Sequence, residues 1–192
     1  MARQSPSDQV YQLKVTLQEI EPPIWRRFQV VGSATLADLH LVLQGVMGWE
    51  NYHLYQFVIG KRRYGVPDPE RPDIRDSAGV ELSQVAPQRG STLRYDYDFG
   101  DGWEHGLLVE EIAPRAVGKQ YPRCVLGARA CPPEDCGGTG GYAELLEVIG
   151  DPGHERHHEL MEWIGGPFDA ERFDLDAVND ALQARIRSAD RA

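Results

Sequence analysis

Three cysteines and three nearby histidines are the residues in this sequence best suited to hold a metal ion. They are Cys124, Cys131, Cys136, His154, His157 and His158. Thiolate and imidazole are natural ligands of zinc, and a closed tetrahedral site needs four of them. The three cysteines with His154, or with one of the other two histidines, therefore predict a structural zinc ion as cofactor. Because the spacing lacks paired C-x-x-C knuckles, the alternative interpretation is that the cysteines are small buried core residues.

A second group of reactive side chains lies in the segment 93–109, which reads LRYDYDFGDGWEHGLLV. Asp98, Asp101 and His105 supply carboxylates and an imidazole, the groups that general acid and base catalysis or metal-assisted hydrolysis would use. The alternation of polar and apolar residues predicts a β-hairpin around a Gly-Asp-Gly turn. Whether the three side chains meet depends on how the two strands of this hairpin pair.

Two registers of the hairpin are compatible with its turn residues. A two-residue loop would place Asp98 opposite His105. A three-residue loop instead pairs Phe99 with Trp103 and Tyr97 with His105, and it alone forms one continuous apolar face. We expect the three-residue loop, with its last glycine in the left-handed region and His105 among aromatic side chains. This register argues against catalysis by His105 and the carboxylates.

Periodicity predicts the elements that carry these groups. Strands are expected over 10–20, 24–31, 51–60 and 63–65, with a loop over 66–79. Helices are expected over 35–47, 142–149, 154–164 and 175–187, the last three after a loop over 113–141. The predicted fold is α+β, with a mainly antiparallel sheet, a β-grasp-like strand-strand-helix start and a helical C-terminal part. We expect a single domain over 9–188 after a disordered tail over 1–8.

The composition excludes several classes of protein. With 192 residues, of which 41% are hydrophobic and 26% charged, the chain can bury a core and is not a disordered protein. A net charge of -10 disfavours nucleic acid and anionic membrane as partners. The tight basic groups are Arg26-Arg27 and Lys61-Arg62-Arg63. Neither a membrane-spanning apolar run nor a signal-peptide region is present in the sequence, so we expect a cytoplasmic protein.

Five groups of residues resemble one known family. They are Ile24-Trp25-Arg26-Arg27; Thr35-Leu36-x-x-Leu39-His40 with Met47-Gly48-Trp49 and His53-Leu54; Tyr97-Asp98-Phe99-Gly100-Asp101-x-Trp103-x-His105; Cys124-x-x-Gly127 with Ala130-Cys131-Pro132-Pro133-Glu134-Asp135-x-Gly137-Gly138 and Gly141-Tyr142; and Phe168-Asp169 with Phe173. In this order they resemble the plasmid pRiA4b ORF-3-like domain family. The resemblance implies an α+β domain found in bacterial, archaeal and mobile-element proteins, and it implies no defined activity.

The interpretation that we favour is a non-enzymatic binding or scaffold domain, associated with mobile elements, whose partner is a protein or a small-molecule ligand. Its motif positions are rich in Trp, Gly and Pro, which rigid folds and recognition surfaces use at least as often as catalysis does. Trp25, Trp49 and Trp103 are predicted to be structural. Two alternatives stay open: a metal-assisted hydrolase that uses His105 with neighbouring carboxylates, and a nucleic-acid-associated accessory protein.

Overall fold

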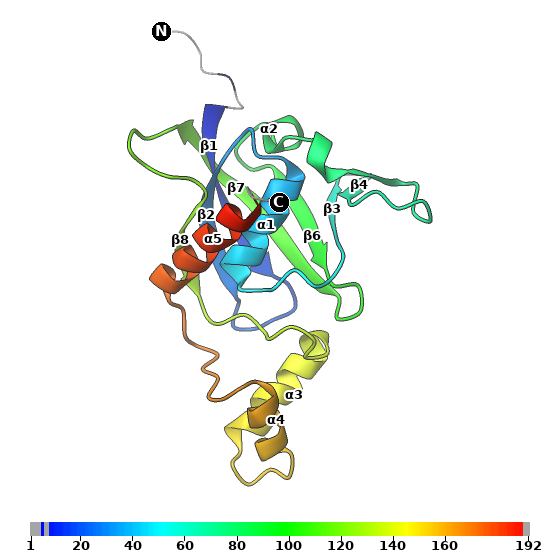
Figure 1. Ribbon diagram of the computed structural model, residues 1–192, viewed down its shortest axis with the longest axis vertical. Coiled ribbons are helices and arrows are strands. Elements are labelled where there is room, and N and C mark those ends of the chain that lie inside the picture. The colour runs from blue at the N-terminus through cyan, green and yellow to red at the C-terminus, as the bar shows by residue number, and fades with distance from the viewer. Residues whose placement is uncertain (1–4, 6–7, 190–192) are drawn as a thin grey trace.

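The computed structural model describes residue 5 and residues 8–189 (Figure 1). The tail predicted over 1–8 lies, apart from Ser5 and Asp8, outside the described residues. The described chain forms one sheet with helices against it, so the α+β fold class is confirmed. None of the described helices is long and apolar enough to cross a membrane.

The elements follow the predicted order, with several short additions. The strands are β1 (Gln9–Leu17), β2 (Trp25–Val31), β3 (Tyr55–Ile59), β4 (Arg62–Gly65), β5 (Ile74–Asp76), β6 (Thr92–Tyr97), β7 (Trp103–Pro114) and β8 (Arg123–Ala128). The helices are α1 (Leu36–Met47), α2 (Leu82–Val85), α3 (Gly138–Gly150), α4 (His157–Trp163) and α5 (Leu175–Ala189), with a 3-10 turn η2 (Ser77–Gly79).

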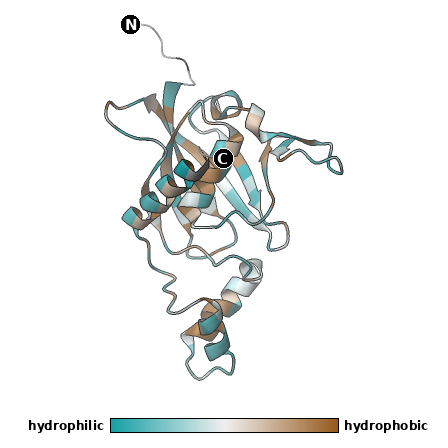
Figure 2. Cartoon of the chain, in the orientation of Figure 1, coloured by the Kyte–Doolittle hydropathy of each residue, from teal (hydrophilic) through white to brown (hydrophobic). Residues whose placement is uncertain are grey.

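The sheet has eight strands in the described part of the chain, in the order β5-β4-β3-β6-β7-β1-β2-β8. All neighbouring strands are antiparallel except β4 and β5. Helix α1 covers one face and α5 packs beside it, whereas α3 and α4 lie beyond one end of the sheet (Figure 1). Figure 2 shows hydrophobic residues on the strands behind α1 and many hydrophilic residues on α5.

The start of the fold follows directly from its residue pattern. In β1 the alternate side chains Leu13, Val15 and Leu17 are buried, and the strand pairs with β2 on one side and β7 on the other. The first turn of α1 is capped by Thr35 and Asp38, whose side chains bond reciprocally to backbone N–H groups. The predicted strand-strand-helix start is therefore confirmed.

Two of the three tryptophans predicted to be structural lie in the core, and the third does not. Trp49 and Trp103 are buried, but Trp25 is only partly buried. Alternation along β2 directs Phe28 to the core and Trp25 to the open face of the sheet, where Lys14 lies over its ring at 4.9 Å. Trp25 therefore lies outside the core, because it alternates with Arg26 and Phe28, whose side chains are buried.

The register predicted for the β6–β7 hairpin was also wrong, although the predicted face was right. Tyr97 pairs with Trp103 and Tyr95 with His105, which leaves a five-residue loop over 98–102. Asp98 has left the strand with φ 54°, and its carbonyl oxygen accepts a hydrogen bond from the Gly102 N–H at 2.6 Å. Relative to the predicted register, each residue of β6 pairs with a residue two positions earlier in β7. Because side chains alternate with a period of two, every side chain stays on its predicted face of the sheet.

The segment 113–141, expected to be a loop, contains two unpredicted stretches of structure. Strand β8 pairs with β2 at the edge of the sheet, and α3 begins at Gly138 rather than near Tyr142. An edge strand with partly exposed residues on both sides lacks the strict alternation on which strand prediction depends. The glycine run before Tyr142 obscured the helix start, since glycine has low helix propensity.

Candidate metal-binding site

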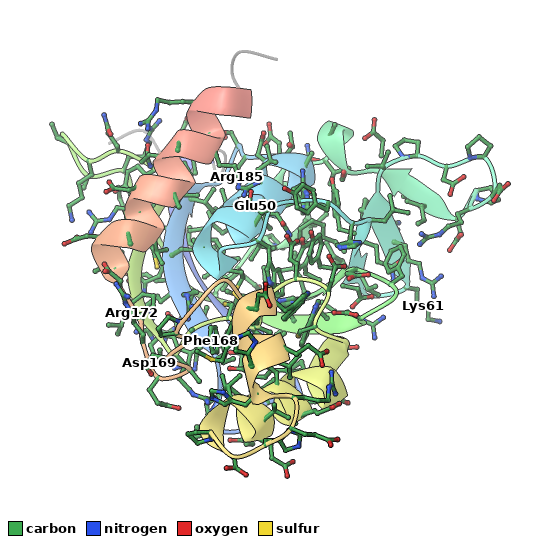
Figure 3. The ribbon with its side chains drawn as sticks, turned by 60° about the horizontal axis from the view of Figure 1, so that its bottom comes forward. Glu50, Lys61, Phe168, Asp169, Arg172 and Arg185 are labelled. Atoms are coloured by element: carbon green, nitrogen blue, oxygen red, sulfur yellow. The ribbon has the colours of Figure 1, made fainter. Side chains whose placement is uncertain are left out.

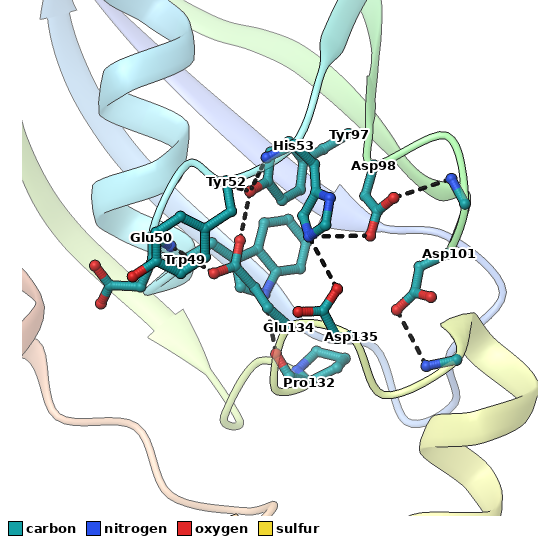
Figure 4. Close-up of polar contacts among 12 residues, drawn as sticks. Trp49, Glu50, Tyr52, His53, Tyr97, Asp98, Asp101, Pro132, Glu134 and Asp135 are labelled. Atoms are coloured by element: carbon teal, nitrogen blue, oxygen red, sulfur yellow. Dashed lines mark hydrogen bonds and ion pairs between the residues drawn. The ribbon is translucent and has the colours of Figure 1, made fainter.

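Three loops meet at one end of the core (Figure 4). They are 48–54 between α1 and β3, 98–102 between β6 and β7, and 131–137 before α3. Strands β3, β6 and β7 are neighbours in the sheet, so the first two loops lie at the same end of these strands. The Asp98 N–H donates to the Leu54 carbonyl oxygen at 3.0 Å and fixes this approach. Each loop contains part of a motif quoted above.

One side chain from each loop contributes to a compact cluster of possible metal ligands: His53, Asp98 and Asp135. One ligand atom from each residue lies within 4.8 Å of the other two. The His53 Nε2 atom is 3.0 Å from Asp135 Oδ1 and 3.6 Å from Asp98 Oδ2. Nε2 is buried, yet it makes no hydrogen bond of acceptable geometry with any described residue.

The backbone holds both aspartates in a sparsely populated conformation. Asp98 and Asp135 have φ values of 54° and 60°, in the left-handed region. The Asp98 side chain is only 9% exposed, and its Oδ1 atom accepts a hydrogen bond from the Gly100 N–H at 2.9 Å. This bond leaves Oδ2 directed toward His53. Strained residues of this kind concentrate at functional sites, although aspartate tolerates the left-handed region better than most residues.

Hydrogen bonds to Pro132 and Glu134 hold the 131–137 loop in place. The Trp49 Nε1–H donates to the Pro132 carbonyl oxygen at 2.9 Å. Glu134 accepts hydrogen bonds from the Glu50 N–H at 2.9 Å and from the Tyr97 hydroxyl. Burial, together with the neighbouring Glu134, raises the pKa of Tyr97, so the hydroxyl keeps the proton that it donates. These contacts set the position of Asp135.

A buried histidine of α1, His40, contacts the 48–54 loop. The His40 ring stacks on Tyr55 at 3.6 Å, and its Nε2 atom lies 2.7 Å from Asn51 Oδ1. Because an amide oxygen only accepts, Nε2 carries a proton, and Nδ1 accepts from the Tyr95 hydroxyl at 2.8 Å. Burial lowers the pKa of His40 to about 4, which keeps the ring neutral. The neutral ring holds Asn51 two residues before His53.

Comparisons with known proteins agree with this architecture. The sequence model of the plasmid pRiA4b ORF-3-like protein family matches residues 9–177. The chain belongs to this family. An uncharacterized protein, y4hQ of Sinorhizobium fredii, is 42% identical over 176 residues, which are 90% of each chain. The crystal structure of a protein of unknown function, MM3350 from Methanosarcina mazei Go1, matches with a TM-score of 0.79 and 39% identity over 88% of this chain and 96% of that one.

The catalytic group considered from the sequence is not assembled in this pRiA4b ORF-3-like protein. His105 is fully buried, its Nδ1–H donates to the Tyr95 carbonyl oxygen at 3.2 Å, and burial lowers its pKa to about 4. Asp98 turns toward His53 instead, and Asp101 accepts a hydrogen bond from the Gly137 N–H at 3.1 Å. His105 therefore belongs to the core, whereas the two aspartates belong to the loop cluster.

The cysteines likewise do not gather into one site. The only set of three ligand atoms within 4.8 Å among the described residues is the one around His53, and it contains no cysteine. The Cys124 Sγ atom faces the carbonyl oxygens of Arg27 and Leu126, and Cys131 Sγ contacts Met47 Sδ at 3.7 Å. The unpredicted strand β8 accounts for this separation, because it fixes Cys124 against β2. Of the histidines predicted as the other zinc ligand, His154 lies before α4, and His157 and His158 are its first two residues.

The basic groups of this family member are also separated. Arg26 and Arg27 lie on β2, whereas Arg62 and Arg63 lie on β4 next to Lys61. Four strands of the sheet stand between β2 and β4. These residues therefore do not form the single basic face that a nucleic-acid partner would require.

Sequence reasoning did not propose His53 as a site residue. It lies in a loop without periodicity, far along the chain from both aspartates. The one available signal was the His53-Leu54 pair in the family resemblance. The spacing of residues along the sequence can indicate metal ligands that lie on one helix or in one short C-x-x-C turn. It does not indicate ligands that three separate loops bring together.

Gly138 is a position at which this site admits no side chain. A Cβ atom there would lie 2.4 Å from the Asp101 carbonyl oxygen, and φ is 69°. We expect Gly138→Ala to lower the free energy of unfolding by about 2 kcal/mol or more, from strain and overpacking together. Chemical denaturation measures this loss. Gly140→Ala is the matched control, because nothing lies within 4 Å of its added Cβ; equal losses in both variants would contradict the packing described.

Proposed function

We propose that the protein is a binding domain that holds one divalent metal ion on His53, Asp98 and Asp135. Three protein ligands leave coordination positions open, so the ion would present a binding point to a further ligand. The ligand would be a small molecule or a group on a protein. The cytoplasmic location and the mobile-element association stay predictions from the sequence.

The geometry around His53 Nε2 carries this proposal. For metal–ligand bonds of about 2.1 Å, neighbouring ligands in a tetrahedral or octahedral shell are about 3.0–3.4 Å apart. The distances of 3.0 and 3.6 Å from Nε2 to the two carboxylate oxygens are close to these ligand–ligand distances. The alternative is an Nε2–H group held between the two carboxylates, but such a group would donate a well-directed hydrogen bond, and Nε2 makes none with the described residues.

The charge around the site also favours a cation. Four carboxylates, those of Asp98, Asp101, Glu134 and Asp135, come from two of the loops. No lysine or arginine nitrogen among the described residues lies within 4.0 Å of them. One imidazole and two carboxylates suit first-row ions such as Mn²⁺ or Zn²⁺, whereas Ca²⁺ and Mg²⁺ prefer oxygen alone.

A cleft beside the cluster makes metal-assisted hydrolysis the second candidate. Asp135 also lines a cleft of about 310 Å³, together with Arg156, which directly precedes α4, and Trp163 of α4. A substrate in this cleft would lie next to the ion, and a metal-bound water is a nucleophile near neutral pH. In this hydrolase hypothesis the histidine of the site is His53, whereas the hypothesis drawn from the sequence used His105.

Isothermal titration of the purified, untagged protein with MnCl₂ and ZnCl₂ tests the proposal. We expect one ion per chain, and we expect His53→Ala, Asp98→Asn and Asp135→Asn each to weaken binding by at least about 10–100-fold, the effect of losing even an outer-shell partner. Asp73→Asn, an exposed carboxylate paired with Arg63, is the control and should bind normally. Absence of binding by the unmodified protein, or equal weakening by the control, would refute the site.

A further inference from the structure

Arg26 is a buried cation that no carboxylate in the described part of the chain neutralises. It lies on β2 and is 3% exposed. Its Nε–H donates to the Val46 carbonyl oxygen at 3.0 Å, and Nη1 donates to the Trp25 and Ala128 carbonyl oxygens at 2.9 and 2.8 Å. Among the described residues no carboxylate oxygen lies within 4.0 Å of it.

The other polar partner of the guanidinium is a thiol. Nη2 donates to Cys131 Sγ at 3.3 Å. Burial raises the pKa of this thiol, so the sulfur is neutral at pH 7. Val46 lies near the C-terminal end of α1, where the helix dipole supplies only about half a negative charge. A guanidinium has five N–H groups, so one Nη2–H is left without a partner among the described residues. The net positive charge of Arg26 is therefore only partly compensated.

Arg26 lines a groove of about 620 Å³ with mostly apolar walls. The groove lies between α1, α5 and the segment 167–174 that leads into α5, where Figure 3 shows Phe168, Asp169 and Arg172. The apolar walls include Gly45, Phe168, Phe173, Ala177, Val178 and Ala181. Its volume falls within the range of about 300–1,000 Å³ that is usual for small-molecule sites. The Phe173 ring packs over the guanidinium carbon at 4.7 Å, so the cation adjoins the apolar wall.

The charges at the rim limit the ligand to a single negative charge. Asp169 and Asp174 both line the groove. Arg172, the other cation of the lining, lies 3.4 Å from Asp174 and is engaged by it. Because Arg172 and Asp174 neutralise each other, a dianion such as phosphate would face the Asp169 carboxylate with only Arg26 to offset its charge. A monocarboxylate matches one buried guanidinium.

We propose that this groove binds a small organic monocarboxylate with an apolar body, with its carboxylate on Arg26 and its body against α5 and Phe168. This site is independent of the metal site proposed above. It also gives a role to two motifs that the metal site leaves unused, the Trp-Arg-Arg string of β2 and the Phe-Asp string before α5. Burial of the apolar body would supply most of the affinity, and the guanidinium would supply the selectivity for an anion.

Octanoate is a suitable probe, and octan-1-ol is its uncharged counterpart. Both are titrated calorimetrically into full-length protein that has been stripped of metal by dialysis, so that carboxylate binding to a metal ion does not contribute. We expect saturable binding of octanoate at about millimolar concentration or below, and binding of octan-1-ol at least about tenfold weaker. Inorganic phosphate should not compete.

Two variants locate the binding. Arg26→Gln removes the charge, and Ala181→Trp fills the groove from an exposed position of α5 while leaving Arg26 in place. We expect each to weaken octanoate binding at least about tenfold, and Lys61→Gln, a distant exposed cation, to leave it unchanged. If Arg26→Gln fails to fold, Ala181→Trp and the comparison with octan-1-ol still decide. No octanoate binding, equal binding of octan-1-ol, or full binding by Ala181→Trp would overturn the proposal.

Discussion

Replacing Trp49 by alanine is expected to lower the free energy of unfolding by about 3–5 kcal/mol, the usual cost of truncating a buried tryptophan. The indole is buried between the core and the 131–137 loop. It stacks on Tyr97 at 5.0 Å, meets His105 edge-on at 5.2 Å, and donates to the Pro132 carbonyl oxygen. The substitution leaves a large cavity in the core and releases the loop that carries Asp135.

Chemical denaturation of Trp49→Ala beside Trp25→Ala measures this effect. Trp25 lies on the open face of the sheet, so its truncation should cost about 1 kcal/mol or less, mainly from lost contact with Lys14 and Arg27. The denaturant slope should stay the same in both variants, which would show that the folded and unfolded states are otherwise unchanged. Equal losses in the two variants would contradict the assignment of Trp49 to the core.

Acidification is expected to produce the second large effect, because two buried histidines must be neutral in the folded protein. Burial lowers the pKa of both His40 and His105 from 6.5 to about 4. Between these values the unfolded chain binds protons that the folded chain excludes. Stability is therefore full above about pH 6.5 and falls as the pH drops toward 4, by up to about 3 kcal/mol for each histidine.

Denaturation curves at half-unit steps from pH 7.5 to pH 4.5 test this expectation. The slope of stability against pH should approach two protons per molecule in the unmodified protein and one in His105→Leu. Glu110, whose pKa is lowered by its hydrogen bond to Arg27, adds a further loss only at the acid end of this range. A stability that does not change between pH 7 and pH 5 would show that the two rings are not held neutral.

The parts of the fold that were predictable are those in which one local pattern dominates. Strict alternation identified β1 and β2, and apolar spacing with Thr35 identified α1. The hairpin around Asp101 was placed on the right face but in the wrong register. Its face depends on a period of two, whereas its register depends on Asp98 adopting a left-handed conformation. Residue type alone does not determine which residue of a turn does so.

The candidate site was less predictable because it depends on tertiary contacts. Asp98, Glu134 and Asp135 were recognised as members of the family motifs, but their meeting with His53 requires three loops to converge. The predicted cysteine site assumed that all three cysteines lie in one loop over 113–141. Strand β8 within that segment instead fixes Cys124 against β2. Where backbone pairing overrides local composition, ligand spacing in the sequence says little about distance in space.

Anomalous X-ray diffraction from crystals grown with ZnCl₂, recorded at the zinc absorption edge, tests the central claim most directly. We predict one strong peak about 2.0–2.2 Å from His53 Nε2, Asp98 Oδ2 and Asp135 Oδ1, the distances usual for zinc. Crystals of Asp98→Asn grown in the same way should lack this peak. A zinc ion held by Cys124, Cys131 and Cys136, or no peak between the three loops, would contradict the proposed metal site.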